Sequence, residues 1–111
     1  MKTLNDIKKN TIKLTRDVAK QCNDSHVNVL YVLSKTHMLA MVNGYNRAPG
    51  IIKHTGKTVL DGCTMTTVVE TTNEKIATIT TEAVHDGKIV AVARLVNTAE
   101  NDKETNWVIA A

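Results

Sequence analysis

The sequence is short of aromatic residues. Its 111 residues include no phenylalanine, one tryptophan and two tyrosines. Valine, isoleucine and leucine supply 28 residues, so the core of a folded domain has to be aliphatic. The length is enough for one compact domain and too short for two. A domain of this size buries a limited area, and association between subunits helps to complete an aliphatic core.

Cysteine and long apolar runs are also scarce. The two cysteines, Cys22 and Cys63, are too few for a disulfide-rich scaffold. Only Cys22 and His26 have the local spacing of a metal-ligand pair, so we predict no metal site and no cofactor. The first residues, MKTLNDIKKN, lack the apolar segment of a secretory signal, and no apolar run is long enough to cross a bilayer. We therefore expect a cytoplasmic protein with free thiols and no membrane partner.

Charge is divided unevenly along the chain. Residues 1–60 carry ten lysines and arginines against three aspartates, a formal +7, whereas residues 61–111 carry four against eight acidic residues, a formal −4. The whole chain is therefore +3. This polarity predicts an anionic partner for the basic half, or copies that pack basic face against acidic face. The alternative is that folding interleaves the two halves.

Apolar residues at spacings of three and four predict an amphipathic helix over about residues 3–22. Thr3 is in the N-cap position, and Asp6 follows where a capping box needs an acceptor. The opposite face of this helix forms a basic stripe of Lys9, Lys13, Arg16 and Lys20. We expect the stripe to be exposed and unnecessary for folding.

Residues 26–43 consist of two apolar runs separated by three polar residues. Valine and tyrosine favour a hairpin here, while methionine, leucine and alanine leave a single helix open. Residues 43–58 hold three of the five glycines and the only proline, and are predicted to form a basic loop. Strands follow at about 63–72, 75–85, 88–97 and 105–110, with Asp86–Gly87 as a type I′ turn.

These patterns predict an α+β fold, in which an N-terminal amphipathic helix packs on a mostly antiparallel sheet rich in threonine and valine within a single compact domain. The Asp86–Gly87 turn sets a register that places Val84 opposite Ile89, Ala83 opposite Val90 and Ile79 opposite Arg94. Strand 88–96 is then apolar on both faces. A helix can cover one face and a second subunit the other, so we expect a homo-oligomer.

The predicted loop is where we expect ligand binding. Its segment GIIKHTGKT has five residues between the glycines where a Walker A loop has four, so the P-loop motif is not met. Its cations and backbone amides can nevertheless hold an anion, and an arginine within an apolar strand requires an anionic partner. The candidate ligand-binding residues are Tyr45, Asn46, Arg47, Lys53, His54, Lys57 and Arg94.

No cysteine, serine or carboxylate pair has the surroundings of a catalytic site, so we predict no catalytic residue. The first hypothesis is a non-enzymatic homo-oligomer that binds a phosphate-bearing ligand, a small nucleotide in preference to nucleic acid. The alternative is a small protein-binding inhibitor or regulator whose basic helix docks on an acidic partner. A weaker alternative, an oligomeric enzyme of the hot-dog type such as a thioesterase, depends only on the order of helix and strands.

Overall fold

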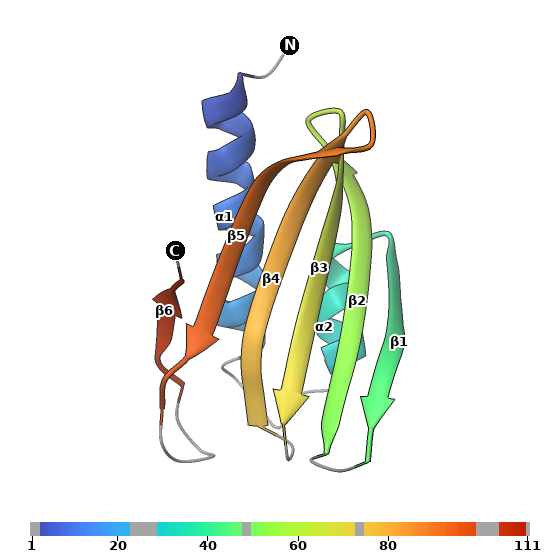
Figure 1. Ribbon diagram of the computed structural model, residues 1–111, viewed down its shortest axis with the longest axis vertical. Helices are drawn as coiled ribbons and strands as arrows, with labels where there is room; N and C mark the ends of the chain where they lie inside the picture. Colours follow the sequence, from blue (N-terminus) through green and yellow to red (C-terminus); the bar gives the residue numbers. More distant parts are fainter. Residues whose placement is uncertain (1–2, 23–28, 48–49, 73–74, 100–104, 111) are drawn as a thin grey trace.

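The computed structural model describes residues 3–22, 29–47, 50–72, 75–99 and 105–110 (Figure 1). These residues form one compact domain with two helices and a sheet. The helices are α1 (Leu4–Cys22) and α2 (Val29–Thr36). The strands are β1 (Leu39–Asn46), β2 (Ile51–Leu60), β3 (Cys63–Thr72), β4 (Lys75–His85), β5 (Lys88–Asn97) and β6 (Trp107–Ile109).

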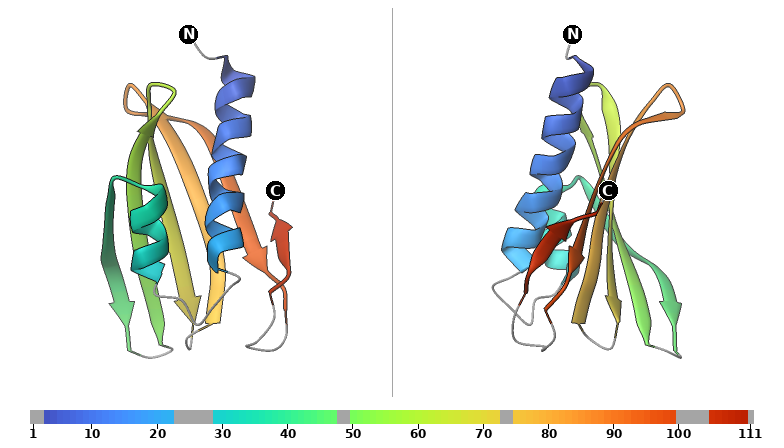
Figure 2. Two further views of the ribbon diagram at one scale, coloured as in Figure 1. Left: turned by 180° about the vertical axis from the view of Figure 1, so that it is seen from behind. Right: turned by 60° about the vertical axis from the view of Figure 1, so that its left-hand side comes forward.

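The sheet is a simple meander, in which each strand pairs antiparallel with the next in the order β1-β2-β3-β4-β5-β6. Both helices lie on one side of it, with α1 over β4 and β5 and α2 over β1 and β2 (Figure 2). We call this side the inner face. The opposite side, seen from the front in Figure 1, has no described element over it and is the outer face. The predicted α+β class and antiparallel sheet are confirmed.

Helix α1 begins as the sequence predicts. The amide of Thr3 donates to Oδ2 of Asp6, and the amide of Asp6 donates to Oγ1 of Thr3, both at 3.2 Å. This reciprocal pair is a capping box, and it satisfies two amides that a helix start otherwise leaves without partners. The four residues of the basic stripe are exposed, as expected: Lys9, Lys13, Arg16 and Lys20.

Both interpretations of residues 26–43 are wrong in the described part, which begins at Val29. Val29–Thr36 is a helix of eight residues, and Leu39–Asn46 is an edge strand. Val29, Val32 and Leu33 are the buried residues of the helix, and their spacing of three and four is helical. Because almost every position in this segment is apolar, that period could not be distinguished from a strand.

The predicted basic loop over residues 43–58 is also wrong. Residues up to Asn46 belong to β1, and Ile51–Leu60 is a ten-residue strand inside the sheet. The glycine within this strand, Gly56, allows another part of the chain to come close to the sheet and does not indicate a loop. Gly56 lies against the His37 ring on the inner face, where a β-carbon would come within 2.8 Å of Cγ. Only glycine leaves room for a ring this close to the sheet.

The turn between β4 and β5 is confirmed, but the register beyond it is wrong by one residue. Asp86 and Gly87 have φ values of 52° and 75°, as a type I′ turn requires, and Val84 lies opposite Ile89. A bulge at Val90 then places Ala83 opposite Ala91, and Thr80 opposite Arg94. A slip of one residue turns every later side chain to the other face.

As a result, the inner side of β5 carries alanine and leucine side chains that are buried, and its outer side is exposed. Ala91, Ala93 and Leu95 are buried under α1. Val92 is 57% exposed, and Arg94 is exposed on the outer face, so the expectation of an arginine enclosed by an apolar strand is wrong. The last strand, predicted over 105–110, covers only Trp107–Ile109.

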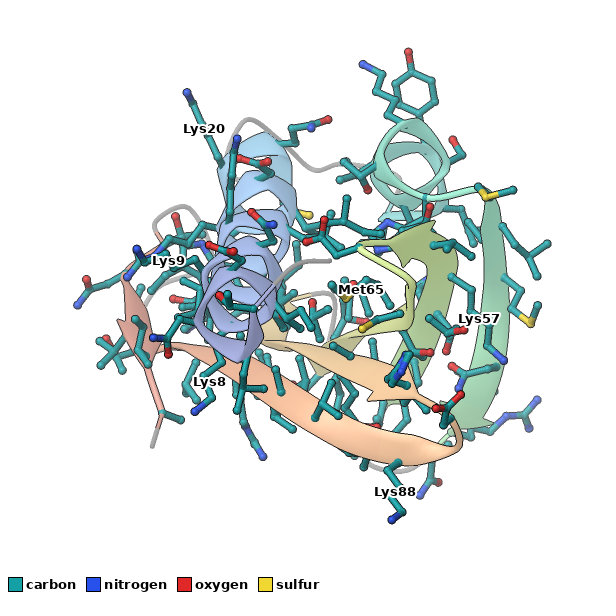
Figure 3. All side chains as sticks on the ribbon, turned by 90° about the horizontal axis from the view of Figure 1, so that it is seen from above. Lys8, Lys9, Lys20, Lys57, Met65 and Lys88 are labelled. Atoms are coloured by element: carbon teal, nitrogen blue, oxygen red, sulfur yellow. The ribbon has the colours of Figure 1, made fainter. Side chains whose placement is uncertain are left out.

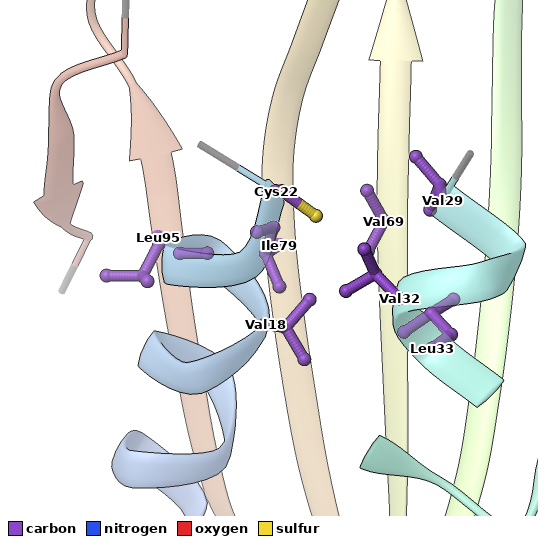
Figure 4. Packing of buried hydrophobic residues seen from close by; sticks show 9 residues of the cluster. Val18, Cys22, Val29, Val32, Leu33, Val69, Ile79 and Leu95 are labelled. Carbon is purple, nitrogen blue, oxygen red and sulfur yellow. The ribbon is translucent and has the colours of Figure 1, made fainter. Parts of the chain in front are cut away.

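The core between the helices and the sheet is aliphatic, as the composition predicted. Figure 4 shows α1 and α2 meeting over β3 and β4, where Val18 and Cys22 face Val32 across Val69 and Ile79. A smaller cluster of Cys63, Met65, Ala83 and Ala91 fills the other end of the inner face. Both cysteines are free and buried, and burial raises the pKa of the Cys22 thiol to about 11.

A chain of buried hydroxyl groups runs between these two clusters. The Thr15 hydroxyl donates to Oγ1 of Thr81 at 2.8 Å, and Thr81 and Thr67 share a hydrogen bond of 2.9 Å. Nε2 of His37 lies 2.7 Å from Oγ1 of Thr67, and its Nδ1 lies 2.7 Å from Oγ1 of Thr36. The chain therefore ties α1, both central strands and the end of α2 together through groups that are satisfied within the protein.

Candidate functional site

The structure distributes the predicted ligand-binding residues over three places. Lys53 and Lys57 are exposed on the outer face of β2, and Arg94 is on the same face of β5, three strands away. His54 is half-buried on the inner face, opposite Val69. Its Nδ1 has no hydrogen-bond partner in the described residues, and desolvation lowers the pKa of its imidazole.

The remaining three candidates follow one another at the end of β1. Tyr45 is 64% exposed, and Asn46 and Arg47 are exposed beside it. These three residues are therefore accessible, but Lys57 lies near the other end of the neighbouring strand, opposite Leu39. The structure brings Lys53, Lys57 and Arg94 onto one face and leaves the rest apart from them.

A small pocket lies elsewhere, between α1, β5 and β6. It is lined by Ile12 and Thr15 of α1, by Val92 to Leu95 of β5, and by Ile109 and Ala110. Ile12 is an apolar side chain on the otherwise polar side of α1, and it is 37% exposed. We call this pocket, together with the edge of β5 that continues from it toward Lys88, the β5 groove.

The backbone of β5 is only partly paired along this groove. Strand β6 pairs with Leu95–Asn97, and the Ala110 amide donates to the Arg94 carbonyl at 2.9 Å. Both backbone groups of a residue in an antiparallel strand point to the same side, and alternate residues share that side. Val92 is therefore the next residue whose backbone points out of the sheet, and the described residues supply no strand to pair with it.

The helix beside the groove is positively charged. Lys8 and Arg16 are four residues before and after Ile12, so helical geometry places all three side chains on one stripe. Figure 3 shows Lys8 and Lys9 on the side of α1 nearest β5 and β6, whereas Lys20 points away. None of these cations forms an ion pair within the described residues; the pair found there is His85 with Asp86, at 3.3 Å.

The β5 groove therefore combines three features. It has unpaired backbone donors and acceptors, an apolar contact at Ile12, and cations along one side. These are the elements that recognise an extended, acidic peptide by addition of a strand. Sequence reasoning found the cations but missed the groove. Ile12, out of place on the basic side of the helix, was the one local signal that could have indicated it.

Comparison with known proteins finds no match: no family model fits the sequence, and neither a curated protein nor a solved structure is significantly similar to the chain. The described part of the chain gathers no group of three or more histidine, cysteine or acidic side chains that could hold a metal ion, and His26 lies outside it. No helix in the same part is long and apolar enough to cross a membrane.

Proposed function

We propose that this protein is a non-enzymatic binding protein that takes an acidic, extended segment of a partner protein into the β5 groove. The observation that carries the proposal is the unpaired edge of β5 beside the cationic side of α1. This is the alternative function that the sequence suggested, an inhibitor or regulator whose basic helix meets an acidic partner. The edge strand adds a specific way of binding.

The geometry of β5 defines how such a segment would lie. A strand that continues the direction of β6 runs antiparallel to β5, pairs first with Val92, and reaches Lys88 after about five residues. Its side chains alternate between the two faces. Those on the inner side meet Ile12, and acidic side chains near the helix meet Lys8 and Arg16. Backbone hydrogen bonds would hold the segment, and the exposed charges would speed its association.

Synthetic peptides test this proposal directly. We expect a fluorescein-labelled peptide that alternates valine with glutamate to bind in fluorescence anisotropy at low salt. The same peptide with lysine in place of glutamate should not bind, and binding of the acidic peptide should weaken as salt rises. Two further peptides should be N-methylated on alternate amides, one at odd and one at even positions. Only one of them should lose binding, because the amides of only one edge of the peptide pair with β5.

Protein variants locate the site. The double substitution Lys8→Glu with Arg16→Glu should weaken binding at least tenfold, and Ile12→Glu should have a similar effect. Lys20→Glu is the matched control, because it reverses a charge on the same helix that points away from the groove. Absence of binding by the acidic peptide, or equal losses from the control and the double variant, would refute the proposal.

A second candidate is the phosphate-bearing ligand predicted from the sequence. The observation in its favour is that Lys53, Lys57 and Arg94 share the outer face. Calorimetric titration with ATP and with a single-stranded oligonucleotide at low salt tests it. Arg94→Ala and Lys53→Ala should each weaken binding by about 1–3 kcal/mol, the value of a hydrogen bond to a charged group, whereas Arg47→Ala, which lies apart from them, should have little effect. No binding by the wild-type protein would exclude this candidate.

We propose further that the protein acts as a homo-oligomer. The argument from the sequence was that β5 needs a cover on both faces. Helix α1 covers the inner face, and on the outer face Ile89 and Val92 remain 56% and 57% exposed. Apolar side chains in this number on an uncovered sheet favour association with another surface.

A further inference from the structure

The outer face of the sheet is open and unusually apolar. Of the fourteen large apolar side chains that are exposed in the described residues, six lie on it: Leu39, Met41, Val59, Ile89, Val92 and Val108. Many of its other positions are threonine or valine, and its charged residues include Lys53, Lys57, Glu70, Glu82 and Arg94. An antiparallel sheet with one face in water normally carries polar and charged residues there. The composition of this face is that of a surface which packs against another.

One row of side chains across this face has a symmetric pattern. Successive cross-strand partners from β1 to β5 are Leu39, Lys57, Thr66, Glu82 and Val92. The row reads apolar, positive, threonine, negative and apolar, with Thr66 of the central strand β3 in the middle. Lys57 and Glu82 both neighbour Thr66 and form no ion pair within the described residues, whereas Lys53 stands directly opposite Glu70 of its own chain.

We infer that a second copy of this chain covers the outer face, in a two-fold sandwich dimer centred on Thr66. This inference rests on the proposed homo-oligomer and names its surface. A two-fold axis that runs parallel to β3 between two outer faces exchanges β2 with β4 and β1 with β5. Lys57 then lies over Glu82 of the partner subunit, and Leu39 over Val92 of the partner subunit. Symmetry repeats both contacts, as an isologous interface requires.

The rows through Thr64 and Val68, on either side of Thr66, place apolar and hydroxyl side chains of β2, β3 and β4 against one another about the same axis. Val68 of β3 meets its own copy, and Val59, which is 65% exposed, lies over Val84 of the partner subunit. Thr55 is only 5% exposed, and its Oγ1 has no hydrogen-bond partner within the described residues. The atoms that bury this oxygen belong to its own chain. The axis places Thr80 of the partner subunit over Thr55, so two further threonines face one another across the interface.

The available area is what a stable dimer needs. Strands β1 to β5 at about 4.8 Å spacing, with eight to eleven residues each at about 3.3 Å, present a face of roughly 700 Å². Standard protein interfaces bury about 800 Å² on each partner. Two such sheets pack about 10 Å apart. The unpaired edge of β5 lies outside this interface, although Val92, which also lines the pocket of the β5 groove, is covered by it.

Sedimentation equilibrium with charge-exchange variants tests the inference. We expect the wild-type protein to have twice the 12.2 kDa mass of the chain at micromolar concentration. Lys57→Glu and Glu82→Lys should each raise the dimer dissociation constant at least tenfold, because each creates two like-charged contacts. The double variant Lys57→Glu with Glu82→Lys exchanges the charges and should restore the constant to within about threefold of wild type.

The matched control is Lys13→Glu, a charge reversal at an exposed position of α1 on the other side of the molecule, which should leave the dissociation constant unchanged. Circular dichroism checks that each variant is folded. A monomeric wild-type protein would refute both the homo-oligomer and this interface. A dimer that both single variants leave intact would refute the interface alone, and single variants that the double variant does not rescue would refute the two-fold register.

Discussion

Replacing Gly56 by alanine tests whether the buried hydroxyl chain is as rigid as its hydrogen bonds indicate. The added β-carbon would lie 2.8 Å from Cγ of His37 and 3.1 Å from its Cδ2 and Nδ1. Carbon atoms in contact are normally about 3.5–4.0 Å apart, so the ring has to move by more than half an ångström or the strand has to shift. His37 is only 6% exposed, so its ring lies in the protein interior.

The hydrogen bonds of His37 set the cost of that movement. Its amide donates to the Leu33 carbonyl at 2.8 Å, and its ring nitrogens are each 2.7 Å from a threonine hydroxyl, Thr36 on one side and Thr67 on the other. Overpacking of a core costs about 1–3 kcal/mol. A buried polar group that loses its partner costs about 1–3 kcal/mol more. Replacing a strand glycine returns about 0.5–1 kcal/mol. We therefore expect Gly56→Ala to lower the free energy of unfolding by about 1–5 kcal/mol.

Urea unfolding followed by circular dichroism, at one protein concentration, measures this change. Gly44→Ala is the matched control, because a β-carbon there would meet Lys53 at an ordinary 3.6 Å. We expect that variant to be unchanged or slightly more stable. In a His37→Ala background the cost of Gly56→Ala should nearly vanish, since the obstructing ring is gone. Equal stability of the two glycine variants, or a cost that persists without His37, would show that the ring is not the obstacle.

Three further changes test other parts of the fold. Burial lowers the pKa of His37 below the 6.5 of an unfolded histidine, so below about pH 6.5 the unfolded state binds more protons than the folded state. The free energy of unfolding should therefore fall by up to about 1.4 kcal/mol for each unit by which the pH is lowered. Urea titrations at pH 7.5 and 5.5 measure this change, and a His37→Gln variant should show a flatter dependence on pH. Thr81→Val removes a hydroxyl that is hydrogen-bonded to two others, and should lower the free energy of unfolding in urea by about 1–3 kcal/mol. Thr81→Ser keeps the hydroxyl and should lower it by less; equal losses would contradict a role for the hydroxyl. Changing Lys9, Lys13 and Arg16 together to glutamine should leave the thermal midpoint within about 2 °C of wild type, because exposed charges contribute little to stability, and a large drop would contradict the outward orientation of the stripe.

The elements that the sequence predicted well are those with strong local signals. The capping residues and apolar spacing of α1 lie within one segment, and strands β3, β4 and β5 have the predicted bounds at Cys63–Thr72, Lys75–His85 and Lys88–Asn97. The Asp–Gly turn at Asp86 required no tertiary information. A second turn of the same kind joins β2 to β3, with φ values of 56° and 75° at Asp61 and Gly62. That signal was available and would have identified β2.

The elements that failed depend on contacts between distant parts of the chain. Val90 forms a bulge in β5, and valine at that position gives no sequence signal of a bulge. Gly56 suggested a loop because the reason for a glycine, the His37 ring, comes from another element. The first residues of helix α2 and of strand β1, at 29–33 and 39–42, are all apolar, so only their packing distinguishes the two elements. Each of these errors has the same physical origin: local propensity is a weak preference that tertiary contacts override.

The candidate sites, too, could be predicted where local signals determine them and not where distant parts of the chain do. The basic stripe of α1 followed from helical spacing and is exposed as predicted. The β5 groove could not be predicted, because it depends on where β6 stops pairing along β5. The outer face was inferred in part, since the apolar character of β5 suggested a second cover. Its symmetric row from Leu39 to Val92 requires the register of five strands, and the predicted register was already wrong in β5.

The threonines of the sheet explain why both faces of this domain can be packed. Threonine has the branched shape that favours strands, and its hydroxyl can bond to a neighbour when it is buried. On the inner face, Thr67 and Thr81 are fully buried and their hydroxyls join one chain. On the outer face, Thr55 is buried but its hydroxyl has no partner in the described residues. Its own chain already buries that oxygen, so a surface packed on the outer face does not reach it. Exposed apolar side chains such as Val59 and Val92, together with the charges of Lys57 and Glu82, are therefore what favours a second copy over the outer face.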